Sequence, residues 1–172
     1  MDKRKFFTRF TAWILMFPML FSPNMTLTRG MVVTVLYRLE GSPEVKELSN
    51  PFNDVVENKW YSNAVKWAAA NGIINGYGNG KFGPEDNITR QDLAVIISRY
   101  ADMAKKSLSE TKSYQNFKDD ADIANYAKEA IEKLFHAKII NGKPDNIFDP
   151  KGEATRAEFA AMLQRFLESI KK

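Results

Sequence analysis

The chain contains no cysteine, and this absence removes several kinds of chemistry at once. A disulfide framework, a zinc–thiolate site and a cysteine nucleophile all need thiols that the 172 residues do not supply. A single histidine, His136, argues against histidine-based catalysis and against a multi-histidine metal site. We interpret His136 as a structural or solvated residue. The sequence therefore predicts no metal site and no cofactor.

The chain also has little net charge. Its 25 Lys and Arg residues against 21 Asp and Glu residues give a net charge of +4, spread along the sequence without a cluster. This excess is compatible with binding acidic polymers, but it is too weak and too dispersed to indicate nucleic acid as a partner. The 44% of hydrophobic residues and 27% of charged residues are typical of a globular chain with a buried core, not of a disordered one.

No hydrophobic run is long enough to span a bilayer comfortably, so we expect no integral membrane span. The segment 1–20 nevertheless resembles part of a secretion signal, because three basic residues at positions 3–5 precede an apolar stretch at 12–21 that only Pro18 interrupts. Arg9 and the lack of a small-x-small cleavage site argue against a signal. The alternative is a truncated or misassigned start whose apolar residues pack on the first repeat of the chain, which begins at position 21.

One segment of the chain recurs. The tetrapeptide Ile-Ile-Asn-Gly stands at 73–76 and again at 139–142, an offset of 66 residues. At the same offset the second segment repeats four further residues, namely Phe82, Pro84, Thr89 and Arg90 as Phe148, Pro150, Thr155 and Arg156. A shorter match lies 61 residues upstream of the first, at Phe21, Pro23, Thr28 and Arg29. We therefore divide the chain into a partial first copy (21–48), a second copy (49–106) and a third copy (114–172).

Each full copy is predicted to fold as helix, loop and helix. In the second copy, apolar residues at helical spacing favour a helix over 62–71 that ends at Gly72, and the glycine-dense loop 75–81 favours several positive φ angles. The second helix of each copy begins after a capping threonine, which is Thr28, Thr89 or Thr155. Thr155 and the glutamate three residues later form a capping box, of which Thr89 has a weaker version. The apolar stripe after each threonine predicts an all-α fold in which these three helices pack against one another.

Together these motifs resemble the S-layer homology (SLH) module, which usually occurs in threes. The second copy carries nearly the whole pattern: Phe-x-Asp at 52–54, an aromatic at Trp60, Gly-Ile-Ile-x-Gly at 72–76, Gly-x-Phe-x-Pro at 80–84 and Ile-Thr-Arg at 88–90. The third copy departs from it by Tyr126 in place of the Trp and by Ala154 in place of the Ile. The first copy matches only the second half of the module.

The resemblance implies a pseudo-three-fold SLH arrangement with a central helix bundle, here with the first repeat truncated. It also implies an extracellular protein at the cell wall or S-layer of a bacterium, which binds secondary cell wall polysaccharide bearing a pyruvylated amino sugar in grooves between modules. Further SLH-containing chains are possible partners. The ligand residues that it implies are Arg29, Arg90, Arg156, Asn75, Gly76, Asn141 and Gly142, to which we add the aromatic residues Trp60 and Tyr126 as candidates for stacking on a sugar.

The chemistry of these residues agrees with such a ligand. A guanidinium meets a carboxylate with two parallel hydrogen bonds, and an arginine at a helix start lies beside free backbone N–H groups that attract anions. The alternative for the arginines is an exposed first-turn residue paired with a nearby acid. Trp60 and Tyr126 would stack on a sugar face, but core packing is the alternative that we favour for them.

Three other functions remain open. A calcium-dependent docking module is suggested by oxygen-bearing side chains near glycine at 75–87, although their spacing fits a calcium loop poorly. The neighbouring acids Asp119 and Asp120 suggest glycoside hydrolysis, but acids are favoured at a helix start in any case, and we predict that the chain is not an enzyme. A protein–protein assembly module, in which another chain completes the partial first copy, is the third.

Overall fold

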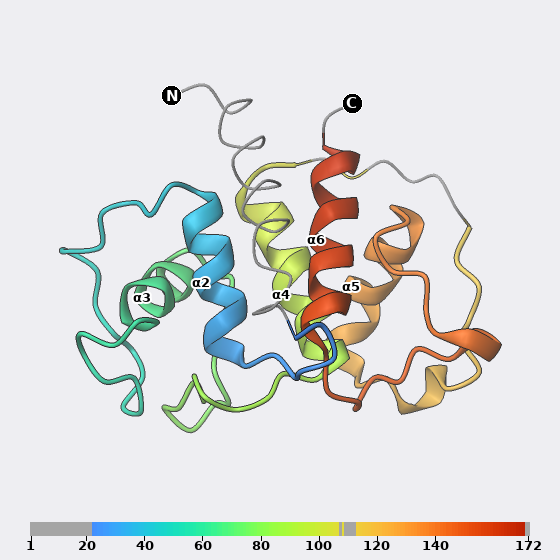
Figure 1. Cartoon of the computed structure of the whole chain (residues 1–172), viewed down its shortest axis with the longest axis horizontal. Coiled ribbons are helices and arrows are strands. Elements are labelled where there is room, and N and C mark those ends of the chain that lie inside the picture. Colours follow the sequence, from blue (N-terminus) through green and yellow to red (C-terminus); the bar gives the residue numbers. More distant parts are fainter. Residues whose placement is uncertain (1–21, 107, 109–112, 171–172) are drawn as a thin grey trace.

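The computed structural model describes residues 22–106, 108 and 113–170, so the apolar segment at 1–20 lies outside the described residues. The described residues form five α-helices and two short 3-10 helices joined by loops (Figure 1). The α-helices are α2 (Arg29–Leu39), α3 (Ser62–Ala70), α4 (Arg90–Met103), α5 (Asn125–His136) and α6 (Arg156–Ser169). The 3-10 helices are η1 (Asp120–Asp122) and η2 (Pro144–Asn146).

Within the described ranges no strand forms, and isolated β-bridges are the nearest approach to a sheet. The predicted all-α class is confirmed. Over the same ranges, none of the helices combines the length and the apolar character that crossing a bilayer requires.

The three capping threonines have the role predicted for them. Thr28, Thr89 and Thr155 stand immediately before α2, α4 and α6, and each hydroxyl accepts a hydrogen bond from the backbone N–H three residues on. Only Thr155 has the complete capping box, in which the Glu158 carboxylate also accepts the Thr155 backbone N–H. The caps hold the first turn of each helix in one geometry, which positions the arginine that follows each threonine.

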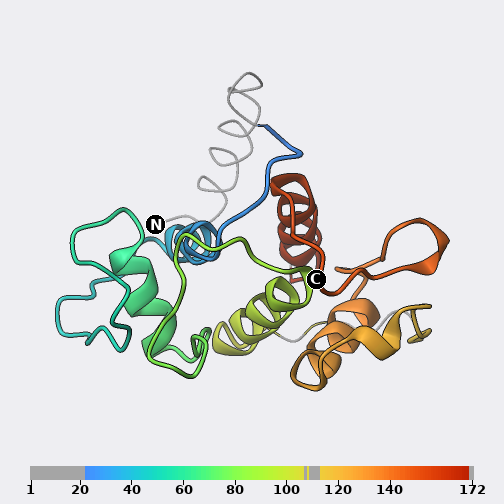
Figure 2. The ribbon, with the colours of Figure 1, turned by 90° about the horizontal axis from the view of Figure 1, so that it is seen from below.

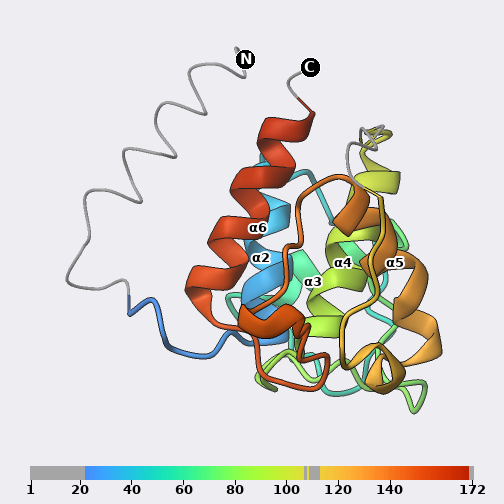
Figure 3. The same cartoon turned by 90° about the vertical axis from the view of Figure 1, so that its right-hand side faces the viewer.

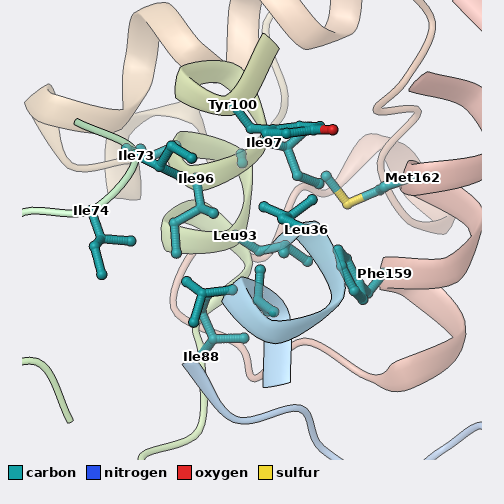
Figure 4. Packing of buried hydrophobic residues seen from close by; sticks show 14 of the residues in the cluster. Leu36, Ile73, Ile74, Ile88, Leu93, Ile96, Ile97, Tyr100, Phe159 and Met162 are labelled. Carbon is teal, nitrogen blue, oxygen red and sulfur yellow. The ribbon is translucent and has the colours of Figure 1, made fainter. Parts of the chain in front are cut away.

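The helices α2, α4 and α6 run through the middle of the molecule, with α3 packed against α2 and α5 packed against α4 (Figures 1 and 3). Their apolar stripes face a shared core, as the sequence predicted. Leu36 of α2, Leu93 and Ile97 of α4, and Phe159 and Met162 of α6 converge there (Figure 4). The helices α4 and α6 also contact each other through aromatic rings. The ring centroids of Tyr100 in α4 and Phe166 in α6 lie 5.5 Å apart.

The starts of these three helices are joined by a closed ring of backbone hydrogen bonds. The residue before each capping threonine is Leu27, Ile88 or Ala154, and all three are buried. The Leu27 N–H donates to the Ala154 carbonyl at 3.0 Å, and the Ala154 N–H donates to the Ile88 carbonyl at 2.9 Å. The Ile88 N–H donates to the Leu27 carbonyl at 2.9 Å and closes the ring. Figure 2 views the molecule from this end.

The glycine-rich loop of the second copy has the backbone that its composition predicted, with φ of +66° at Gly76. A Cβ at Gly76 would lie 2.5 Å from the Phe52 ring and 2.4 Å from the Lys81 carbonyl oxygen. The third copy repeats this contact, because a Cβ at Gly142 would lie 2.6 Å from the Phe117 ring. Each glycine is therefore required by close packing under the phenylalanine of the Phe-x-Asp motif.

Candidate ligand-binding site

Arg29 and Arg90 are the first residues of α2 and α4, and both are buried, with 6% and 9% of their surface exposed. The Arg29 Nε donates to the Phe82 carbonyl at 2.8 Å, and the Arg90 Nε donates to the Phe148 carbonyl at 2.7 Å. Each guanidinium also lies over the ring of that phenylalanine, at 4.9 Å from Phe82 and 5.2 Å from Phe148. The alternative, an exposed first-turn arginine paired with a nearby acid, is therefore wrong in its exposure for both residues, although each does pair with an acid.

The acids that pair with these arginines come from the following copy. Nη1 of Arg29 lies 3.6 Å from Oδ2 of Asp92 on α4, and Nη1 of Arg90 forms an ion pair with Glu158 on α6. Asp92 and Glu158 occupy the third position of their helices. Each ion pair thus joins two successive copies. The sequence of a single copy does not reveal such a contact.

Arg156, the first residue of α6, differs from the other two arginines. The side chain at the third position of α2 is that of Met31, so the first copy offers no acid there. Among the described residues, the Arg156 side chain has no hydrogen bond or ion pair, and it is less buried than Arg29 and Arg90. Arg156 is therefore in a different environment from Arg29 and Arg90.

The expectation of free backbone N–H groups beside these arginines is wrong. The loop of another copy supplies carbonyl oxygens to the first two N–H groups of each helix. At α4, for example, the Arg90 N–H donates to Gly152 at 2.9 Å and the Gln91 N–H donates to Pro150 at 3.0 Å. The threonine hydroxyl takes the third N–H group. Any anion bound here must be held by side chains, because these helix starts are already satisfied.

A cavity of about 170 Å³ lies beside Arg90, between α4, α6 and the loop of the third copy. Asn141 and Gly142, both predicted to line a groove, lie with Arg90 along its wall, as do Lys143 and Glu158. The hydrogen bonds of Arg90 to the described residues use Nε and Nη1, so Nη2 has no hydrogen-bond partner among them. Nη2 is also not one of the fully buried side-chain atoms without a hydrogen bond, of which the described residues have one, in Thr34. That nitrogen therefore keeps contact with solvent and has hydrogen bonds to offer a ligand.

The corresponding place beside Arg29 holds an aromatic ring. The Arg29 guanidinium lies 4.6 Å from the centre of the Tyr77 ring. Tyr77 directly follows Asn75 and Gly76, the predicted contact residues of the second copy, and Asn75 is exposed. The Tyr77 hydroxyl donates to Oδ2 of Asp86 at 2.9 Å, which fixes the Tyr77 ring in this position. Comparison of the copies did not single out Tyr77, because the third copy has a lysine at the equivalent position, Lys143.

Trp60 and Tyr126 are not core residues, so the favoured interpretation of these aromatics is wrong. Trp60 is 49% exposed and Tyr126 is 59% exposed. Trp60 precedes α3 and lies beside the start of α2, because a Cβ at Gly30 would be 3.3 Å from its ring. The two aromatics therefore stand at the starts of different helices, on the surface.

The Tyr126 hydroxyl donates to Oδ1 of Asp92 at 2.6 Å and accepts from the Gln91 amide at 3.1 Å. Partial burial and the bond to Asp92 raise the pKa of Tyr126 to about 12. Since Asp92 is also the ion-pair partner of Arg29, Tyr126 lies on the Arg29 side of the molecule. It is not among the residues that line the cavity beside Arg90.

The aspartates of the Phe-x-Asp motif have a role that the sequence did not reveal. Asp54 accepts the backbone N–H groups of Phe82 and Gly83 at 2.9 and 2.8 Å. Asp119 accepts those of Phe148 and Asp149 at 2.8 and 2.6 Å. Burial raises the pKa of Asp54, but the backbone hydrogen bonds outweigh it and hold this pKa below its ordinary value of 3.8. Both aspartates fix the loops whose carbonyl groups receive the arginines.

The same contacts bear on the alternative functions. Asp119 uses both carboxylate oxygens on the loop, and Asp120 accepts hydrogen bonds from Tyr114 at 2.6 Å and Asn116 at 3.4 Å. These two acids are thus engaged in structural contacts rather than arranged as a catalytic pair. In the part of the chain that the structure describes, no three His, Cys, Asp or Glu side chains are grouped as a metal site.

The family model of the S-layer homology domain matches residues 51–94 and 116–160, which is about half of the chain. The chain belongs to the S-layer homology domain family. Both matched stretches contain the Phe-x-Asp motif, whose aspartate anchors the loop, and the Ile-Ile-Asn-Gly sequence that leads into this loop. The partial first copy, 21–48, lies outside the matched residues.

Known proteins share this SLH region. Amylopullulanase of Thermoanaerobacterium thermosulfurigenes is 36% identical over 148 residues, which is 86% of this chain and 8% of the relative. The cellulosome-anchoring protein of Acetivibrio thermocellus is 30% identical over 87% of this chain and 34% of its own length. S-layer protein EA1 of Bacillus anthracis is 28% identical over 80% of this chain and 15% of its own length. The chain therefore spans about a third or less of each of these relatives.

Proposed function

We propose that this SLH chain anchors a bacterial surface protein noncovalently to secondary cell wall polysaccharide, outside the cell. The observation that carries the proposal is the cavity beside Arg90, where a nearly buried guanidinium keeps Nη2 available between two copies of the repeat. A pyruvylated amino sugar fits this cavity because its ketal carries a carboxylate, which a guanidinium binds with charge-assisted hydrogen bonds. Relatives named as an anchoring protein and as an S-layer protein support this role.

We propose further that the three copies form a pseudo-three-fold arrangement around α2, α4 and α6, with the first copy truncated to 21–48. Two observations support it. The ring through Leu27, Ile88 and Ala154 relates the three helix starts in the same way, and each helix start receives carbonyl groups from the loop of another copy. The second and third copies, 49–106 and 114–172, then contribute the complete modules.

We propose that the chain is not itself catalytic. Amylopullulanase shares only 8% of its length with this chain, and the shared region is the SLH region. A protein–protein assembly role remains the alternative, in which further SLH-containing chains are the partners.

Co-sedimentation with purified wall sacculi tests the proposed function. We expect the protein to pellet with sacculi and to stay in solution once the secondary polysaccharide has been removed chemically. Equal retention on the stripped peptidoglycan would contradict the proposal, and self-association without sacculi would favour the assembly alternative.

A variant assigns the binding to the cavity. Arg90→Lys keeps the charge but loses the planar donor pair, so we expect retention on sacculi to weaken about tenfold. Arg38→Lys is the matched control, because Arg38 is exposed in the last turn of α2. Thermal unfolding of both variants shows whether the fold persists.

A further inference from the structure

The loops beside Arg29 and Arg90 are anchored in the same way, and three of the positions at which they differ lie against one another. The second copy has Tyr77, Gly83 and Asp86, and the third copy has Lys143, Asp149 and Gly152. All three pairs are separated by the 66 residues of the repeat. In each set a glycine leaves the space that another side chain of the set occupies, so we consider the two sets as alternatives to each other.

In the second copy the set holds an aromatic ring in place. A Cβ at Gly83 would lie 2.7 Å from the Tyr77 ring and 2.2 Å from Oδ2 of Asp86, so the ring and the carboxylate both occupy the space that this glycine leaves. The hydrogen bond from the Tyr77 hydroxyl to Asp86 completes the set. The result is a ring over the Arg29 guanidinium, at 4.6 Å.

In the third copy a salt bridge replaces the ring. Asp149 occupies the glycine position with φ of +58° and forms an ion pair with Lys143, which lowers the pKa of Asp149. Gly152 is needed here, because a Cβ on it would lie 2.1 Å from the Asp149 carboxylate. Lys143 lines the cavity beside Arg90.

The two places also differ in charge. Three basic side chains line the cavity, those of Arg90, Lys143 and Arg165. Glu158 pairs with Arg90 and Asp149 pairs with Lys143, which leaves an excess of one positive charge. Beside Arg29, the ion pair with Asp92 and the carboxylate of Asp86 leave no excess of positive charge. An anion is therefore attracted to the cavity and not to the place that Tyr77 covers.

We propose that, of these two places, the cavity beside Arg90 takes the anionic sugar, that the half-exposed Tyr77 ring and the acid Asp86 disfavour an anion beside Arg29, and that Lys143 contributes to the preference for an anion. This inference rests on the proposed function and deepens it. We assign the difference between the two places to these three substitutions, among those that distinguish the two loops.

Two reciprocal variants test this inference. The closed variant transfers the second-copy set to the third copy, by Lys143→Tyr, Asp149→Gly and Gly152→Asp. The open variant makes the opposite transfer, by Tyr77→Lys, Gly83→Asp and Asp86→Gly. Each set is already accommodated by an equivalent loop of this chain, and thermal unfolding verifies that both variants fold.

Isothermal titration calorimetry of the whole chain, with the methyl glycoside of a pyruvyl-ketal N-acetylhexosamine as probe, gives the outcome. We expect about one strong site in the unmodified chain, a loss of at least about tenfold in affinity in the closed variant, and about one additional site in the open variant. The glycoside without the ketal should bind no better to the open variant than to the unmodified chain.

Unchanged affinity in the closed variant, or an unchanged number of sites in the open variant, would overturn the inference. Sedimentation on sacculi separates this result from failure of the proposed function. If the unmodified chain pellets with intact sacculi and the closed variant pellets equally, anchoring stands and the assignment of the cavity is wrong. If the unmodified chain does not pellet, the proposed function itself is wrong.

Discussion

The loop of the second copy and the loop of the third copy differ in the side chains they present but not in the way they are held. In each loop a Phe-x-Asp aspartate accepts two backbone N–H groups, and a phenylalanine ring packs against a glycine with positive φ. In each loop a phenylalanine carbonyl receives the Nε of an arginine from the preceding copy. At the surface, however, one loop presents Tyr77 and the other presents Lys143.

This difference separates the framework of the repeat from the positions that define a ligand. The framework residues satisfy backbone hydrogen-bonding groups or fill close contacts. Changing such a residue in either copy should therefore alter the free energy of unfolding. The variable residues contact one another and the cavity, so exchanging them as a set should alter binding with little effect on the fold. The following three substitutions test the framework side of this comparison.

The largest effect is expected for Gly76→Ala. The new Cβ would meet the Phe52 ring and the Lys81 carbonyl oxygen, at a φ that a residue with a side chain rarely adopts. We expect the free energy of unfolding to fall by about 4 kcal/mol, from the left-handed backbone and the overpacking together. Gly142→Ala is the matched comparison and should cost about 2 kcal/mol less, because its nearest backbone oxygen is 3.1 Å away. Urea unfolding of both variants gives the two values, and equal losses would contradict the comparison.

An intermediate effect is expected for Asp54→Asn. The amide offers one oxygen to two backbone N–H groups, so we expect a loss of about 2 kcal/mol in the free energy of unfolding near neutral pH. Because folding lowers the pKa of Asp54, its charge stabilises the folded state above pH 3.8 and this contribution is lost as the pH falls through the lowered pKa.

Urea unfolding between about pH 2 and 6 measures both parts of this prediction. The difference in stability between the unmodified chain and Asp54→Asn should shrink as the pH falls. A difference that stays constant down to the lowest pH would show that the charge of Asp54 does not act through its two backbone hydrogen bonds.

The smallest effect is expected for Thr34→Val in α2. Thr34 is buried, and its hydroxyl is the one buried side-chain polar atom of the described residues without a hydrogen bond. The equivalent positions of α4 and α6 hold Val95 and Ala161, so the apolar side chain suits this place. We expect the midpoint of urea unfolding to rise, by about 1 kcal/mol in stability. A lower midpoint would mean that the hydroxyl has a partner.

Local features of the fold could be predicted from the sequence because their causes lie within a few residues. The caps at Thr28, Thr89 and Thr155 could be predicted because each threonine directly precedes an apolar helical stripe, where its hydroxyl accepts the N–H of the third helical residue. The end of α3 before Gly72 follows from a glycine at φ of +69°. The all-α class follows from the apolar stripes after each cap.

Contacts between copies could not be predicted in the same way. The acids that pair with Arg29 and Arg90 lie more than 60 residues further along the chain, so the alternative of pairing with a nearby acid did not identify them. Core packing was the favoured interpretation of Trp60 and Tyr126, but one precedes α3, the other lies in the first turn of α5, and both are exposed. Whether they contact a sugar remains a prediction.

The hydrogen-bond ring through Leu27, Ile88 and Ala154 also limits how many copies this architecture holds. A solenoid grows by stacking, since its last repeat exposes the surface that the next one would cover. Here the α6 start is already occupied by the carbonyl groups of Pro23 and Met25, which come from the first copy. Because the ring uses the N–H and the carbonyl of all three residues, a fourth helix start would find no backbone group left in it to pair with.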